Sequence, residues 1–305
     1  MSKNSFCGVI CVLLFALVTQ TAFSADKDKY AVANIWEAGS YTLRQDCFIS
    51  LITSVDKKVA SRDQTQVLFT WHADVSELED GGIQKMNLQA SRVMLRYDSN
   101  NEELAFFDSS NEGANNDFVK EVFRRFTSAS VEVVFKNGEI ENVSVKKDVW
   151  EGFEPEAEDE KAIFERFQAL LTKETFKQIF DPFCWVANQE EVSVKDKWSN
   201  DVITTVQGVG DQNLTWDCKL DSVKKSGSST FANVVADSAL EVKVNDLLTA
   251  NLKANLKVKF NTRIGSPVEL ESRTTVTAVK KSENTEEPEK NIVALQRNNL
   301  TVARR

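Results

Sequence analysis

One histidine and three cysteines are the side chains best suited to chemistry beyond the first 24 residues. His72 lies in a stretch, Val67 to Val75, whose apolar residues occupy odd positions, so strand alternation places it on the polar face beside Thr70 and Asp74. The sequence contains no G-x-S-x-G, HExxH, CxxC or glycine-rich phosphate motif. A glycosidase-like pair of catalytic acids remains an alternative, because such a pair is defined by its geometry in space and not by spacing in the sequence. We therefore expect no enzyme, no catalytic residue, no metal site and no cofactor.

The three cysteines, Cys47, Cys184 and Cys218, allow one internal disulfide. Cys47 and Cys218 lie on the apolar faces of expected strands. Cys184 follows the expected end of a helix, where the backbone has more freedom. We predict a bridge between Cys184 and Cys218, with Cys47 a buried free thiol.

Aromatic residues dominate the expected core, with 19 Phe against 3 Tyr. Two segments change to a helical period, residues 116–129 and 158–183, and the second restarts near Thr172 and should end before Pro182. Asn116 or Asp117 can cap the first helix. The apolar faces of these helices either fill a core or border a hydrophobic ligand. They carry Phe118, Phe123, Phe126, Phe164, Phe167, Phe176 and Phe180.

Most other segments alternate apolar and polar residues with the period of a strand, and Asn137-Gly138 is a strong hairpin turn signal. The sequence therefore predicts a mainly β fold with some α structure, in the α+β class. We expect a long, curved antiparallel sheet or half-barrel with amphipathic helices packed on its apolar face. The segments GSYTLRQDC (39–47) and GDQNLTWDC (210–218) share four residues at the same offsets. This similarity suggests the hypothesis of two related β units.

The longest ribbon, residues 252–278, has apolar residues at even positions on both sides of an IGSP turn. Even positions must therefore pair with even positions for one face to be buried. A three-residue loop from Ile264 to Ser266 meets this condition. It pairs Phe260 with Leu270 and Lys259 with Glu271.

The chain divides into four expected segments. Residues 1–24 read as a signal peptide with a charged start and an apolar run too short to span a bilayer, followed by a small-x-small site ending at Ser24. The mature chain should begin at Ala25 and be periplasmic or secreted, with no transmembrane segment. Residues 25–150 should form an N-terminal β unit with a short helix, 151–190 an acidic linker and helical connector, and 191–305 a C-terminal β unit.

The helical connector is flanked by two stretches, FTSASVEVVFKNGEIENVSV (126–145) and EVSVKDKW (191–198). This arrangement resembles a family of exported bacterial proteins known only as a domain of unknown function. Lys195 stands where that family usually has Gly. The resemblance implies an exported β-rich domain and implies no reaction.

The formal net charge is −9, from 37 basic and 46 acidic residues. Nucleic acids and anionic membranes require a basic surface, so neither is an expected partner. Two functional classes remain. The protein could carry a lipid or other hydrophobic small molecule in a β-sheet cavity, or serve as a cell-envelope scaffold or protein-interaction module.

Overall fold

The computed structural model describes residues 29–111, 116–145, 149–206, 210–245, 248–263, 265–280 and 290–305. The predicted signal peptide and its cleavage site lie outside these residues. The described part is mainly β, as predicted, and it is organised around one 12-stranded antiparallel sheet that does not close on itself.

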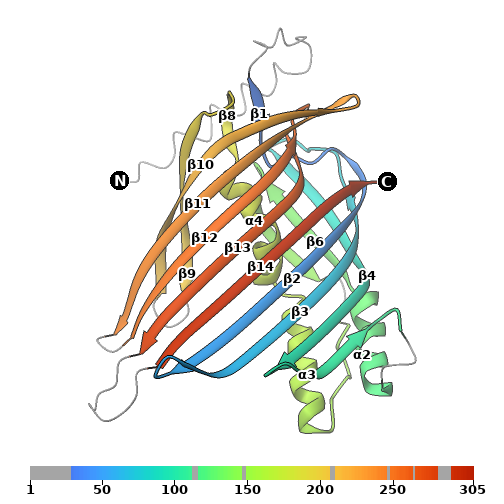
Figure 1. Cartoon of the computed structure of the whole chain (residues 1–305). Helices are drawn as coiled ribbons and strands as arrows, with labels where there is room; N and C mark the ends of the chain where they lie inside the picture. Colours follow the sequence, from blue (N-terminus) through green and yellow to red (C-terminus); the bar gives the residue numbers. More distant parts are fainter. Residues whose placement is uncertain are drawn as a thin grey trace, which may run out of the picture.

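The sheet curves around helix α4 (Figure 1). Its order is β7-β6-β4-β3-β2-β14-β13-β12-β11-β10-β9, with β5 paired to β4. The chain forms it as two meanders that meet where β2 pairs with β14, over Tyr41–Val55 and Lys290–Arg304. The strands are β2 (Gly39–Val55), β3 (Lys58–Val75), β4 (Ile83–Ser99), β5 (Glu102–Asp108), β6 (Ser130–Lys136), β7 (Glu139–Val145), β9 (Lys197–Val206), β10 (Gly210–Ser226), β11 (Ser229–Asn245), β12 (Leu248–Asn261), β13 (Ser266–Lys280) and β14 (Lys290–Arg304).

The two segments with similar sequences begin strands in different places. Gly39 begins β2 near the middle of the sheet, whereas Gly210 begins β10, beside the edge strand β9. The N-terminal meander is also interrupted by a helix between β5 and β6. A duplication therefore stays a hypothesis.

The tight turns follow the local sequence. Asn137 and Gly138 both have positive φ, 52° and 83°, and connect β6 to β7 as predicted. Asn100 and Asn101 connect β4 to β5 in the same way. Asparagine and glycine tolerate this left-handed backbone, so these turns are local properties of the sequence.

In the described part of the chain, three helices pack on the sheet or beside it: α2 (Asp117–Ser128), α3 (Glu158–Ala169) and α4 (Lys173–Val186). The side chain of Asn116 caps α2 by accepting a hydrogen bond from the N–H of Val119, and Thr172 caps α4. The predicted end before Pro182 is wrong, because α4 continues through this residue to Val186. Pro182 removes one helical hydrogen bond, but Phe183 and Val186 on the next turn are fully buried, and their burial favours continuing the helix.

The β12–β13 hairpin has the predicted parity but a different register. Val258, not Phe260, lies opposite Leu270, and Phe260 lies opposite Pro267 next to a bulge. Proline has no N–H to give to the ladder, so a bulge at this position is expected. The shift by two residues keeps the even positions inside, and Phe260 is 0% exposed. It also gives two opposite-charge pairs, Lys259–Glu269 and Lys257–Glu271, at 3.6 and 3.4 Å.

The upper end of the curved sheet, in the orientation of Figure 1, is closed by the segment from Tyr30 to Trp36 and by α4. Strands β1 (Tyr30–Val32) and β8 (Asn188–Val192) form a small second sheet there. The ring of Trp36 then packs against Phe180 and Phe183 of α4, with centroids 6.1 and 6.2 Å apart. Gln84 holds the backbone of Trp36 by donating to its carbonyl (2.7 Å) and accepting from its N–H (3.3 Å).

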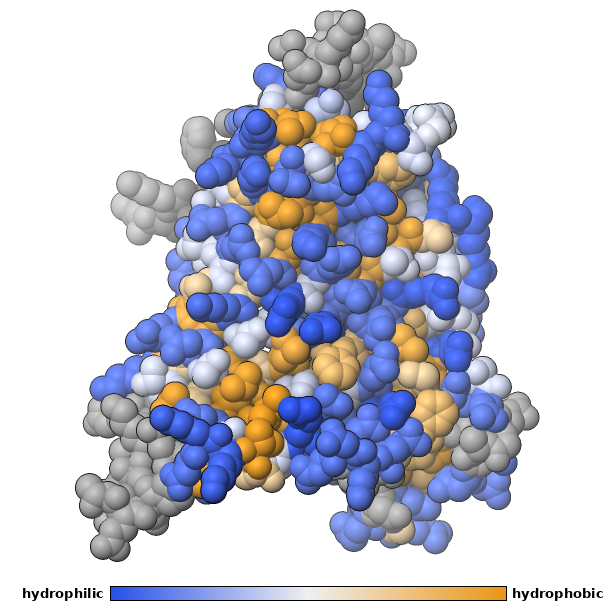
Figure 2. Space-filling view, viewed as in Figure 1, coloured by the Kyte–Doolittle hydropathy of each residue, from blue (hydrophilic) through white to orange (hydrophobic). Residues whose placement is uncertain are grey.

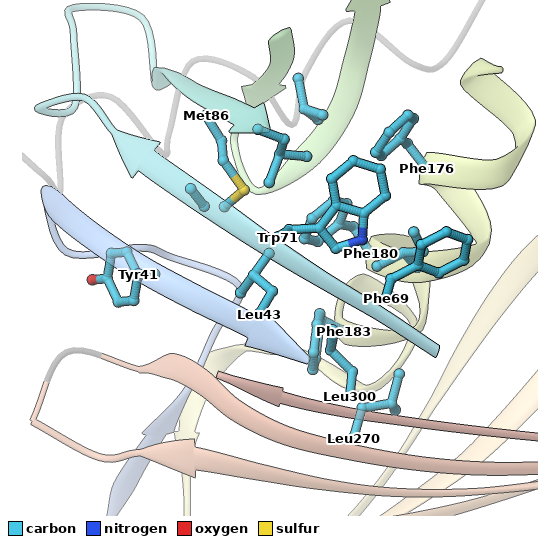
Figure 3. Close-up of a cluster of buried hydrophobic side chains, with 14 of the residues drawn as sticks. Tyr41, Leu43, Phe69, Trp71, Met86, Phe176, Phe180, Phe183, Leu270 and Leu300 are labelled. Atoms are coloured by element: carbon cyan, nitrogen blue, oxygen red, sulfur yellow. The ribbon is translucent and has the colours of Figure 1, made fainter. Parts of the chain in front are cut away.

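The core fills the space between α4 and the upper parts of the strands. Figure 3 shows Trp71 and Phe69 of β3 pointing toward Phe176 of α4, with Leu270 and Leu300 beneath Phe183. All six of these side chains are buried, and the Trp71 and Phe176 rings lie 5.5 Å apart. Because a single buried cluster takes residues from both meanders, the described strands share one core.

Candidate ligand-binding surface

The predicted helical phenylalanines lie among other aromatic rings. Phe126 and Phe176 are 0% exposed. Phe123, Phe164, Phe167 and Phe180 are also buried, and only Phe118 is half-buried, stacked on Phe153 at 5.7 Å. Their neighbours are rings of the same chain, so the structure places them in packed clusters.

The predicted disulfide between Cys184 and Cys218 is absent, because Cys47, Cys184 and Cys218 are all free thiols. The two thiols are directed to different backbone carbonyls: Cys184 Sγ donates to Gly138 at 3.0 Å, and Cys218 Sγ donates to the carbonyl of Trp185 at 3.8 Å. Burial raises the pKa of both thiols to about 12. They are therefore neutral, unreactive core side chains at physiological pH.

His72 occupies the outer face of β3, as the alternation predicts. Its ring contacts the guanidinium of Arg305, and it is partly exposed. No group of three or more His, Cys, Asp or Glu side chains among the described residues could hold a metal ion.

The inner face of the sheet changes character along the strands. Its upper rows are buried beneath α4, as for Leu43 (1% exposed). Cross-strand pairing defines each row, because residues directly opposite one another point to the same side of the sheet. Going down β2, the inward positions after Leu43 are Gln45, Cys47, Ile49 and Leu51.

The middle rows are polar but uncharged on β13, β14 and β2. Gln45 and Asn298 are 7% and 5% exposed, and the Gln45 side-chain N–H donates to Asn298 Oδ1 at 3.2 Å. Gln45 Oε1 has no hydrogen-bond partner among the described residues. Ser272 lies opposite Asn298, and Thr274 lies opposite Gln296. These short polar and amide side chains separate the packed core from the lower end.

The lower rows are apolar again, but most of their described side chains are partly exposed, and only Val242 of β11, opposite Ala250, is buried among them. Leu51 and Ile49 of β2 are 39% and 41% exposed, although both point to the same side as the buried Leu43. One continuous row runs across five adjacent strands through directly paired residues. It consists of Leu240 (β11), Leu252 (β12), Val276 (β13), Ala294 (β14) and Leu51 (β2).

The row below it continues the same surface with Ala250, Ala278 and Ile292, all partly exposed. We call these two rows together with Ile49 the open inner face. No charged side chain belongs to it. The uncharged row ends at Leu51, because the next residue across the sheet is Asp63 of β3, which accepts hydrogen bonds from Ser99 and Tyr97 at 2.7 and 3.3 Å.

The sheet that carries the open inner face is not closed. Strands β7 and β9 are the two edges, and α4 packs against both of them. The helix therefore occupies the gap between the edges in the upper half. Alternation in the sequence predicted that Leu252 and Val276 share one face of their hairpin, but the limited length of α4, 14 residues, decides which inward side chains stay uncovered.

None of the helices in the described part of the chain is long and apolar enough to cross a bilayer.

The profile of a protein family described as "Family of unknown function (DUF6263)" matches residues 81–278 of the chain. This range includes most of the sheet and the three helices α2 to α4. No curated protein matches the chain.

Solved structures give remote similarities. A structure described by its lipid–protein interactions in lipovitellin matches with a TM-score of 0.47 and 12% identity, covering 88% of this chain and 25% of that chain, so this chain spans about a quarter of lipovitellin's length. An outer membrane channel from Pseudomonas putida F1 gives a TM-score of 0.19 at 8% identity, covering 89% and 97% of the two chains. The translocator domain of the autotransporter NalP from Neisseria meningitidis gives 0.18 at 8% identity, covering 86% and 88%. At these scores none of the three carries an argument about function.

Proposed function

This chain belongs to DUF6263, a family of unknown function, and we propose that it is an exported, non-catalytic carrier that holds an acyl lipid or similar apolar ligand on its open inner face. The observation that carries the proposal is the uncharged row from Leu240 to Leu51. It continues the apolar inner face of five strands beyond the end of the packed core. An extended chain of methylene groups is the ligand that such a row fits best.

The energetic argument rests on exposure. Soluble proteins bury large aliphatic side chains that share one face of a sheet, and contiguous exposed apolar surface commonly marks a binding site. Ile49 and Leu51 remain about two-fifths exposed, whereas Leu43, on the same face of β2, is only 1% exposed. An apolar ligand bound along the row would remove these side chains from water. Each Å² of apolar surface buried in this way contributes roughly 25 cal/mol of favourable free energy.

The lining also restricts the class of ligand. The rows of the open inner face hold no Lys or Arg, so affinity there should come from apolar contact, and the inward Lys290 lies one row below Ile292, at the lower rim. The polar rows above it, with Gln296 and Thr274 partly or fully exposed, can accept or donate hydrogen bonds at one end of a bound molecule. A neutral lipid fits both features.

Extraction of the purified protein with organic solvent, followed by mass spectrometry, tests the proposal. The wild type should yield a reproducible lipid, and it should enhance the fluorescence of the neutral probe Nile red. Leu51→Asp should abolish both signals, because a carboxylate in the row would have to be desolvated by the ligand.

Ile203→Asp is the matched control. Ile203 is an aliphatic residue of β9 that is 75% exposed and points to the outer face, so its replacement should leave lipid content and Nile red binding unchanged. Wild-type protein free of lipid and inert toward Nile red would contradict the carrier and favour an envelope interaction module.

Export is part of the proposal and has its own test. The predicted signal peptide at residues 1–24 should be absent from protein recovered from the producing cells. Intact-mass analysis should give a chain beginning at Ala25. A mass that retains Met1 or the apolar run would contradict export by this route.

A further inference from the structure

The outer face of the sheet carries a second candidate site, on the opposite side from the open inner face. Two shallow depressions of about 490 and 220 Å³ adjoin there and share Arg297 and Asn299. They run across strands β11 to β3, and Figure 2 shows this face with hydrophilic side chains over its middle. Most of the residues that line them are polar or charged, and the larger depression also includes Val235 and Leu256.

At the centre of this groove two arginines oppose each other. Arg273 of β13 and Arg297 of β14 are directly paired across the strands, so their Cβ atoms are about 5 Å apart and both side chains point outward. Like charges in directly opposed positions destabilise a sheet. Both side chains are exposed, and neither forms a hydrogen bond or ion pair with another described residue.

The acidic side chains around the arginines are already engaged. Glu271 pairs with Lys257 at 3.4 Å, and Asp46 accepts a hydrogen bond from Gln66 at 3.0 Å. Asp237 accepts one from Asn255. Asp46 and Asp237 keep their negative charge, because their partners are neutral amides, but no carboxylate among the described residues forms an ion pair with Arg273 or Arg297.

We infer that the Arg273–Arg297 pair binds the carboxylate of an acidic saccharide. A carboxylate between two guanidiniums can accept charge-assisted hydrogen bonds from both and would relieve their repulsion. The acids that border the groove disfavour a doubly charged phosphate, whereas a carboxylate carries one negative charge and has two oxygens, one for each guanidinium.

The rest of the groove fits a hydroxyl-rich, extended ligand. Asn255, Asn299 and Gln66 offer amide donors and acceptors along it, and carboxylates such as Asp46 can accept from hydroxyl groups. Phe48 lies directly opposite Arg297 and is partly exposed, so it offers an aromatic surface beside the charged pair. A row of amides with one ring is suited to a sugar chain.

Calorimetric titration of the full mature chain with trigalacturonic acid tests this site, with maltotriose as the uncharged counterpart. Trigalacturonic acid should bind and maltotriose should not, and added salt should weaken the binding. Arg297→Gln should reduce the affinity about tenfold or more, because one charge-assisted contact is lost. The control Arg96→Gln should leave it unchanged, since Arg96 lies in the same cross-strand row but is paired with Asp98 and Glu103.

Thermal unfolding without sugar gives a second readout. Arg297→Gln should raise Tm slightly, because it removes a like-charge contact, whereas an arginine with a structural role would give a lower Tm. The inference is overturned by absence of heat from trigalacturonic acid, by equal binding of maltotriose, or by unchanged affinity in Arg297→Gln. The open inner face is tested separately with Nile red, so either site can fail alone.

Discussion

The two ends of the inner face are made by the same strands but differ in what lies over them. On β2, Tyr41 and Leu43 are 6% and 1% exposed, and Ile49 and Leu51 on the same side are 41% and 39% exposed. The upper end is covered by α4 and by the segment that carries Trp36. Hydrophobic alternation therefore determines which side chains face inward, whereas the covering elements determine which of them become core.

The difference between the ends also separates stability from binding. Side chains at the upper end should contribute strongly to folding, because their removal leaves a cavity or a buried charge. Side chains at the lower end should contribute little to folding and much to ligand affinity. Substitutions at equivalent inward positions can test this contrast.

The largest effect is expected from Phe260→Asp, at the upper end. Phe260 is 0% exposed, so an aspartate there should reduce the free energy of unfolding by more than about 4 kcal/mol or prevent folding. Leu51→Asp, the equivalent change at the lower end, should cost at most about 1 kcal/mol. Urea unfolding curves measure both. Equal losses would contradict the division into a packed and an open end.

Gly138→Ala should weaken the closure of the upper end by about 2–3 kcal/mol. Its φ is +83°, and an added Cβ would lie 2.9 Å from the carbonyl oxygen of Asn34. Gly227→Ala is the matched control, because its φ is +59° and nothing lies within 4 Å of the new Cβ, so it should cost only about 1 kcal/mol. Similar melting curves for the two variants would show that the contact with Asn34 is unimportant.

The helix that closes the upper end carries a partly buried acid. Burial raises the pKa of Asp181 to about 6, although the ammonium of Lys177, 3.8 Å from Oδ2, opposes the shift. The folded state therefore binds more protons than the unfolded state between about pH 4 and 6, and stability should fall as pH rises through this range.

Asp181→Asn should remove that slope and raise the free energy of unfolding at neutral pH by on the order of 2 kcal/mol. Urea unfolding at a series of pH values measures it. A wild-type stability that rises between pH 4 and 6, with a variant of the same slope, would assign the titration to other groups.

The smallest effect on stability is expected at the lower end. Ile49→Ala should cost about 0.5–1 kcal/mol, because its side chain is already two-fifths exposed. The same variant should bind Nile red more weakly than the wild type. A loss of stability as large as that of a core truncation, about 3 kcal/mol, would mean that Ile49 is covered in solution.

Local features of the fold could be predicted from the sequence where one short segment decides them. The Asn137-Gly138 turn and the Asn116 cap are of this kind. The inward parity of the β12–β13 hairpin was also predictable, but its register differed by two residues, because the strands pair up to Asn261 and Ser266 and a bulge lies beside Pro267. Helix α4 passes Pro182 because Phe183 and Val186 find a buried position in the tertiary structure.

The candidate site was less predictable. The sequence indicated an aromatic, mainly β interior, and the helical phenylalanines lie in packed clusters. The open inner face depends on the pairing of β2 with β14, about 250 residues apart, and on the place where α4 ends. No periodicity in one segment carries such long-range information. The opposed Arg273 and Arg297 likewise become neighbours only through strand register.

Photo-crosslinking with a neutral lipid that carries a diazirine on its acyl chain tests the carrier most directly. After irradiation and digestion, fragmentation mass spectrometry identifies the labelled residues. The expected result is labelling at inward positions of the lower end, such as Leu51, Val276 and Ala294, with none at the outward Ile203. Labelling at the outward neighbours Ile52 and Val293 alone, or no labelling, would contradict ligand binding on the open inner face.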